Sequence, residues 1–220
     1  MKHQLILALD VKTLEKAKYF VKKLSPKIKI FKIGIQPFVA YGLEIIKFIK
    51  KERAEVFLDL KFFDIPHAVA EAVRQAVHLK VKMMTLHILG DEEMIKAAIK
   101  AADEESKKLK IKRPLLIGVT ILTSKEANSS DVLTLARIGL ECGLDGVVCS
   151  AREAKLLRAK LKRNFFIVTP GIRPASFKKD DQKRTVTAAE AIDAGSDFLV
   201  VGRPILEAAD PLAAASSILK

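Results

Sequence analysis

The sequence predicts a (β/α)8 TIM barrel that residues 1–220 form as a single α/β domain. Three observations lead to this prediction: the chain length suits a single barrel, half of the residues are hydrophobic, and about eight short apolar segments alternate with longer amphipathic ones. The alternative is a doubly wound sheet, which usually has a glycine-rich phosphate loop after its first strand. Here the first strand runs into LDVKTL, which contains no glycine.

The expected strands are nearly continuous apolar runs, as is typical of parallel strands that are buried on both faces. In chain order they are QLILALD (4–10), IKIFKIG (28–34), EVFLDLK (55–61), MMTLHI (83–88), LLIGVTI (115–121), GVVCS (146–150), NFFIVTP (164–170) and FLVVGR (198–203). Amphipathic helices are expected between most of them. TLEKAKYFVKKL (13–24) follows the first strand, and PHAVAEAVRQAVHL (66–79) follows the third.

Polar residues lie at or just beyond the C-terminal ends of these strands. They are Asp10, Lys32, Asp59, Lys61, His87, Thr120, Thr123, Arg173 and Arg203. In a barrel, the C-terminal ends of all strands converge on one mouth, where the active site of such enzymes lies. The sequence therefore predicts a functional site at this mouth.

The formal net charge of +13 raises the question of a nucleic-acid or membrane partner. The lysines are scattered at helical spacing among apolar residues, which indicates solvated helix faces. The chain has only two tyrosines and no basic patch interleaved with aromatic residues, so we expect no nucleic-acid partner. No apolar run is long enough to span a bilayer, so we expect no membrane partner either.

The cysteines indicate a reducing compartment. Cys142 and Cys149 are the only two, and neither forms a CxxC pair or a metal-ligand spacing, so we expect free, buried thiols. The first residues, MKHQLILALDV, contain an apolar run that is too short for a signal peptide, and Asp10 interrupts it. A cytoplasmic location follows as an expectation.

Charged residues interrupt the third strand and the loop after it. Asp59 and Lys61 are two residues apart, so on a regular strand their side chains point to the same side. Lys32 ends the neighbouring strand, and a loop could bring Asp64 back to the same place. These four residues are either a salt-bridged plug of the barrel mouth or a functional site, because each charge holds the others ionised in both cases.

The ends of the last two strands suggest a phosphate site. TPGIRP (169–174) ends the seventh strand and VVGRPI (200–205) ends the eighth. Barrels frequently bind phosphate with the loops after these two strands, and Gly202 and Arg203 suit that role, although a simple turn explains GRP alone equally well. Between these strands, the polar segment ASFKKDDQKRT (175–185) is long enough to act as a lid.

The chain resembles the orotidine 5'-phosphate decarboxylase family. The matching stretches are LALD, FKIG, FLDLKFFDIP, VTILTS, TPGIRP, DDQKR and VVGRPI, in the order of the family and over essentially the whole chain. The resemblance implies decarboxylation of orotidine 5'-monophosphate to UMP and CO2, the last step of de novo UMP synthesis. It implies no metal and no organic cofactor.

The resemblance also assigns catalytic roles. Lys61 is the cation beside C6 of the pyrimidine and the proton donor, and Asp59 and Asp64 flank it. Lys32 completes the charged row and reaches the ribose hydroxyls, and Asp10 lies on the ribose side. The family forms homodimers, in which the aspartate that corresponds to Asp64 reaches into the site of the partner subunit.

Further residues are implied to bind substrate. They are Ile65 and Thr123 on the nucleotide side, Gln182, Gly202 and Arg203 at the phosphate, and Arg173 on the substrate side. Ala68 departs from the family pattern, which usually has a threonine there whose hydroxyl contacts the nucleotide. We expect His87 to be a structural, hydrogen-bonded histidine rather than a catalytic one.

Two other functions compete with this one. A Mg²⁺-dependent phosphosugar decarboxylase or aldolase of the same superfamily shares the D-x-K-x-x-D core, but it typically places an acidic metal ligand at the end of the second strand, where this chain has Lys32. A non-catalytic basic barrel that binds RNA or phosphate explains the net charge but not the charged row.

Overall fold

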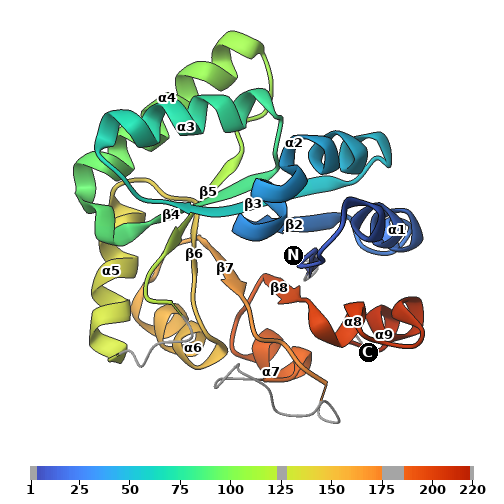
Figure 1. Ribbon diagram of the computed structural model, residues 1–220. Helices are drawn as coiled ribbons and strands as arrows, with labels where there is room; N and C mark the ends of the chain where they lie inside the picture. Colours follow the sequence, from blue (N-terminus) through green and yellow to red (C-terminus); the bar gives the residue numbers. More distant parts are fainter. Residues whose placement is uncertain (1–3, 123–127, 175–185, 219–220) are drawn as a thin grey trace.

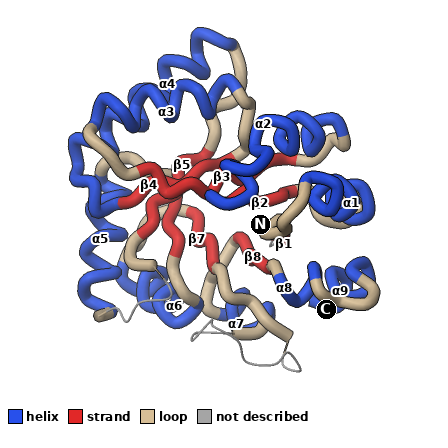
Figure 2. The backbone as a smooth tube through the Cα atoms, viewed as in Figure 1, coloured by secondary structure: helices blue, strands red, loops and turns tan. Residues whose placement is uncertain are grey.

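The computed structural model describes residues 4–122, 128–174 and 186–218, and within them eight parallel strands close into a barrel with β8 paired to β1. Helices surround the strands (Figure 1 and Figure 2). The strands are β1 (Gln4–Ala8), β2 (Ile30–Gly34), β3 (Glu55–Phe62), β4 (Met83–His87), β5 (Leu115–Val119), β6 (Gly146–Val148), β7 (Phe166–Thr169) and β8 (Phe198–Val201). The helices are α1 (Leu14–Leu24), α2 (Ile35–Lys51), α3 (Pro66–His78), η1 (Ile88–Gly90), α4 (Asp91–Leu109), α5 (Ser129–Glu141), α6 (Ala151–Lys160), α7 (Ala188–Asp193), α8 (Arg203–Leu206) and α9 (Pro211–Ile218).

The predicted fold class is confirmed, and the doubly wound alternative is wrong. Each of the eight expected segments contains a strand, and neighbouring strands along the chain are neighbours in the barrel. The sixth strand is shorter than expected, because Ser150 turns out of the sheet and caps α6 by accepting a hydrogen bond from the Glu153 N–H. The two helices named from the sequence are α1 and α3.

The continuous apolar runs follow from burial on both faces of the sheet. In β1, Ile6 and Ala8 belong to the cluster inside the barrel, whereas Leu5 and Leu7 pack in the larger cluster between strands and helices. Successive side chains point to opposite faces and both faces are covered, so most strand positions before the mouth are apolar. The charged residues at the C-terminal strand ends, such as Lys32 and Lys61, therefore lie together at the mouth.

The two thiols differ in burial. Both are free, but only Cys149 is fully buried, and Cys142 is half-buried rather than buried as expected. Burial raises the pKa of the Cys149 thiol far above its ordinary value, which keeps it protonated and unreactive. Among the described helices, none is both long and apolar enough to cross a membrane.

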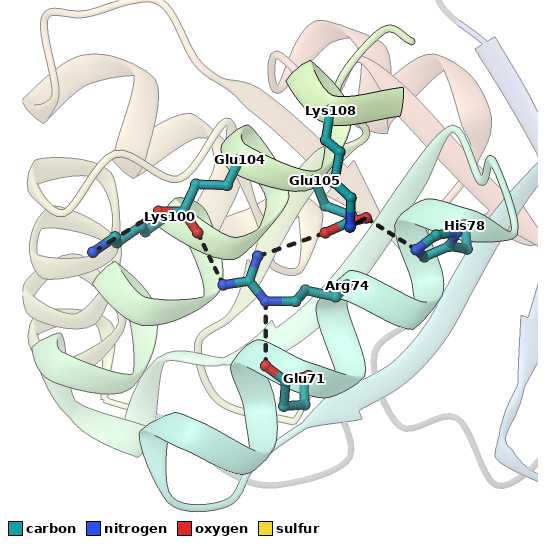
Figure 3. A network of polar contacts seen from close by, with 7 residues as sticks. All are labelled: Glu71, Arg74, His78, Lys100, Glu104, Glu105 and Lys108. Carbon is teal, nitrogen blue, oxygen red and sulfur yellow. Dashed lines mark hydrogen bonds and ion pairs between the residues drawn. The ribbon is translucent and has the colours of Figure 1, made fainter. Parts of the chain in front are cut away.

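A network of charged side chains joins α3 to α4 (Figure 3). Its centre is Glu105, which is only 7% exposed and lies 3.0 Å from His78 Nε2, 3.4 Å from Lys108 Nζ and 3.8 Å from Arg74 Nη1. The more exposed Glu104 pairs with the same Arg74 at 2.9 Å. Because α3 begins two residues after Asp64, this network fixes the helix that leaves the barrel mouth.

Replacement of Glu105 by glutamine is expected to destabilise the fold. The amide has nearly the same shape but no charge, so Arg74, Lys108 and His78 lose a common carboxylate partner in a buried position. We expect a loss of about 2 kcal/mol in the free energy of unfolding, which lowers the melting temperature by roughly 4–8 °C. The matched control is Glu104→Gln in the same network, which removes an exposed carboxylate and should move the melting temperature by about 1 °C or less. Equal shifts in both variants would contradict the role of Glu105.

Candidate active site

A cavity of about 560 Å3 opens at the C-terminal mouth of the barrel, where the sequence predicts a site. Its floor is apolar and includes Ala8, Phe57, Val119, Val148, Val168 and Val200. Its polar lining includes Asp10, Lys32, Asp59, Lys61, Arg173, Gly202 and Arg203. Seven residues predicted from the ends of five strands therefore line one cavity.

Four of these side chains form a row of alternating charge along β1, β2 and β3. Lys32 Nζ lies 3.8 Å from Asp10 Oδ1 and 3.2 Å from Asp59 Oδ2, and Lys61 Nζ lies 2.9 Å from Asp59 Oδ1. The expected Lys–Asp–Lys arrangement across two adjacent strands is thus present. The Lys32 and Asp59 side chains are 12% and 13% exposed, so the centre of the row is largely withdrawn from water, and charges interact more strongly there.

Asp59 is the central acid of the row and stays ionised. Burial alone would raise the pKa of its carboxyl group. The charges of Lys32 and Lys61 act against burial, and hydrogen bonds from the Lys61 ammonium and the Thr85 hydroxyl act with them. The net effect holds the pKa of Asp59 below its ordinary value, so this carboxylate is charged throughout the neutral range.

The local shape of β3 differs from the regular strand that the sequence suggested. Leu58 pairs with Met84 and Phe62 pairs with Leu86, so four steps along β3 match two steps along β4, and the strand is bulged between them. Lys61 lies in this bulge with a φ of 53°, the left-handed region that a residue with a side chain rarely adopts. The prediction that the Asp59 and Lys61 side chains contact each other is therefore right. The reason given for it, alternation along a regular strand, is wrong.

Asp64 lies away from this row in the single chain. Its side chain is exposed, and its Oδ1 accepts a hydrogen bond of 2.7 Å from the Ile65 N–H at the start of α3. Among the described residues, the ion pair recorded for Lys61 is with Asp59 alone. The loop after β3 therefore does not return Asp64 to the row of its own chain, and Ile65 is 66% exposed beside it.

The ends of β7 and β8 form another part of the cavity wall. Gly171, with a φ of 80°, and Arg173 follow β7, and Gly202 is the residue before α8, whose first residue is Arg203. Arg173 is only 8% exposed, and its backbone N–H is bonded to the Val186 carbonyl group. Cations and a left-handed glycine thus lie together where barrels of this type bind phosphate.

Some predicted residues lie elsewhere or cannot be placed. Thr123, Gln182 and the expected lid at 175–185 lie outside the described residues. Thr120 is fully buried and donates a hydrogen bond to the Val148 carbonyl group, which is a structural role. The His87 ring lies 5.6 Å from the Phe63 ring, and Ala68 is half-buried in the first turn of α3.

Sequence reasoning missed Thr85. This residue lies in the middle of β4, is fully buried, and contacts both the Asp59 carboxylate and the Lys61 backbone. A signal was available, because Thr85 is the one polar residue within the apolar run MMTL, beside the charged strand β3.

Comparisons with known proteins show similarity to one family in both sequence and fold. The family model described as "Orotidine 5'-phosphate decarboxylase / HUMPS family" matches residues 3–218. The chain is 43% identical over 229 residues to the orotidine 5'-phosphate decarboxylase of Trichlorobacter lovleyi, covering 99% of this chain and 94% of that protein. It is 44% identical over 230 residues to the protein of the same name from Coxiella burnetii, covering 99% and 95%. A crystal structure of orotidine 5'-phosphate decarboxylase from Lactobacillus acidophilus is similar, with a TM-score of 0.86, 33% identity and coverage of 99% and 97%.

Proposed function

This chain belongs to the orotidine 5'-phosphate decarboxylase / HUMPS family, and from that membership we propose that it is a cytoplasmic enzyme converting orotidine 5'-monophosphate to UMP and CO2 without a cofactor. The observation that supports this most directly is the row Asp10–Lys32–Asp59–Lys61, which lines a cavity with an apolar floor. A salt-bridged plug would fill the barrel mouth, whereas this row borders open space large enough for a nucleotide.

In the proposed reaction, the bond between C6 and the carboxylate breaks and its electron pair stays on C6. The Lys61 ammonium stabilises the developing negative charge and then gives C6 its proton, and solvent returns a proton to the amine. Asp59 holds the Lys61 ammonium at 2.9 Å, so its direction is fixed before the charge develops. Preorganised charge of this kind needs no rearrangement during the reaction.

The remaining contacts bind the nucleotide. We assign the ribose to Asp10 and Lys32 and the phosphate to Arg203, the Gly202 backbone and Gln182. Thr123 is assigned to the pyrimidine, and Ile65 and Arg173 to the substrate without a specified contact. The phosphate is remote from the bond that breaks, yet its binding energy can lower the barrier by ordering the charged row.

We further propose a homodimer in which Asp64 completes the site of the partner subunit. Asp64 is exposed in the single chain, and exposed apolar residues follow β2, β3 and β4 at the same end of the barrel. They are Ile35, Val39, Leu43, Phe63, Ile65 and Leu89. Ile35 and Val39 are four residues apart in the first part of α2, before the kink at Tyr41, and therefore share one face there. A patch of this kind at the barrel mouth suits a two-fold interface.

Mixing two inactive variants tests the shared site. Lys61→Ala and Asp64→Ala homodimers should each be inactive, because every site lacks one group. After subunit exchange, each heterodimer has one site with both residues intact, so roughly a quarter of wild-type activity per subunit should return. No recovery, with exchange verified by differently tagged subunits, would show that Asp64 serves its own subunit.

Loss of the orotate absorbance band tests the proposed activity itself. Purified protein should remove this band from orotidine 5'-monophosphate, form UMP, and keep its activity in EDTA. Activity that EDTA abolishes would favour the Mg²⁺-dependent phosphosugar enzymes, although Lys32 occupies the position of their typical acidic ligand. Folded protein that is inactive but binds RNA would favour the non-catalytic basic barrel.

A further inference from the structure

Thr85 is the single residue of β4 that lies opposite the bulge of β3. Between the pairs Leu58–Met84 and Phe62–Leu86, β4 supplies only this residue opposite three residues of β3. A bulge leaves backbone groups without their regular ladder partners, and a buried N–H without a partner is costly. The Lys61 N–H is such a group, and it donates a hydrogen bond of 2.9 Å to Thr85 Oγ1.

The Thr85 hydroxyl also fixes the acid of the charged row. It lies 3.0 Å from Asp59 Oδ1, and because an ionised carboxylate only accepts, the hydroxyl donates this bond. Asp59 Oδ1 accepts a second bond, of 2.9 Å, from the Lys61 ammonium. The result is a closed ring: Lys61 backbone, Thr85 hydroxyl, Asp59 carboxylate and Lys61 side chain.

This ring joins the strained backbone of Lys61 to the far end of its own side chain. A left-handed conformation of a residue with a side chain persists only where its surroundings determine it fully. The Thr85 hydroxyl supplies two of the three bonds of the ring from the rigid centre of β4. Its side chain is fully buried, so it acts on the site without touching a ligand in the cavity.

We propose that Thr85 is a positioning residue that sets the Lys61 ammonium and the Asp59 carboxylate for proton transfer. The proposal rests on the proposed decarboxylase function and adds to it a residue outside the cavity. If the hydroxyl is removed, the Lys61 N–H loses its hydrogen-bond acceptor, and the Asp59 carboxylate loses the hydrogen bond that Thr85 donates. Both ends of Lys61 are then less well fixed, while the nucleotide-binding groups stay in place.

The test compares Thr85→Val, which keeps the shape and loses the hydroxyl, with Thr85→Ser, which keeps the hydroxyl. For the valine variant we expect kcat to fall about 10- to 100-fold and KM for orotidine 5'-monophosphate to change by less than about threefold. The serine variant should stay within about threefold of wild-type kcat. If the valine variant does not fold, Thr85→Ala replaces it, and the serine result remains decisive.

Three kinetic outcomes would overturn the proposal: a folded valine variant with wild-type kcat, a serine variant as damaged as the valine variant, or a loss confined to KM. A carboxyl ¹³C titration of Asp59 gives a readout that does not depend on turnover. Because a hydrogen bond to the charged form lowers a carboxyl pKa, the pKa of Asp59 should be higher in the valine variant than in the wild type. Wild-type protein without activity would refute the proposed function, whereas an unchanged Asp59 titration would refute the role of Thr85.

Discussion

Lys61→Ala is expected to abolish decarboxylation, with a fall in kcat of at least about 10⁴-fold. Two contributions are lost together. A positioned proton donor contributes about 10²- to 10⁴-fold, and a preorganised charge beside the developing carbanion contributes about 10²- to 10³-fold. In the proposed reaction Lys61 supplies both contributions, and its ammonium lies 2.9 Å from Asp59 while its backbone lies in the bulge of β3.

The fold and much of the phosphate affinity should survive this change. Arg203 and Gly202 follow β8 rather than β3, so UMP should still bind with an affinity within about tenfold of wild type. The matched control is Lys155→Ala, which removes an exposed lysine from α6 and should leave kcat unchanged. Near-normal turnover by the Lys61 variant, in folded protein, would refute the catalytic assignment.

The fold was predictable because a closed parallel barrel imposes a simple pattern on the chain. Each strand is covered on both faces, so it is mostly apolar and appears in the sequence as a continuous apolar segment. Charged side chains follow this segment where the strand reaches the mouth of the barrel. Asp10 and Lys32 illustrate this, since they belong to separate segments yet lie 3.8 Å apart. Knowledge of strand order alone is enough to place them together.

The details of β3 were not predictable in the same way. A bulge depends on how two strands share hydrogen bonds, and the sequence of β3 does not show that Lys61 adopts a left-handed conformation. The role of Thr85 follows only from that bulge, because on a regular ladder its hydroxyl would have no backbone N–H to accept from. The exposed position of Asp64 likewise depends on the path of a loop, which no periodicity determines.

Replacement of Asp59 by asparagine is the second change with a large expected effect. The amide has the shape of the carboxylate but cannot balance the charges of Lys32 and Lys61, which lie 3.2 Å and 2.9 Å from its oxygens. Breaking a buried ionic group by removing one partner costs about 3–5 kcal/mol, which corresponds to roughly 10²- to 10³-fold or more in kcat/KM if the loss falls on the transition state. The control is Asp193→Asn, an exposed aspartate at the end of α7, which should leave kcat/KM unchanged.

The pH dependence of unfolding provides an independent measurement of the same carboxylate. Because the pKa of Asp59 is lower in the folded protein than the ordinary value of about 3.9, the unfolded chain binds the proton more readily. The stabilisation that Asp59 contributes is therefore fully present above about pH 5 and is lost as the pH falls through the folded pKa. Asparagine does not titrate, so the difference in unfolding free energy between wild type and Asp59→Asn should be constant from about pH 5 to 7 and should shift against the wild type at lower pH. Urea unfolding of both proteins across this range measures the difference. A difference that shifts in favour of the wild type on acidification would mean that burial, rather than the two lysines, dominates the environment of Asp59.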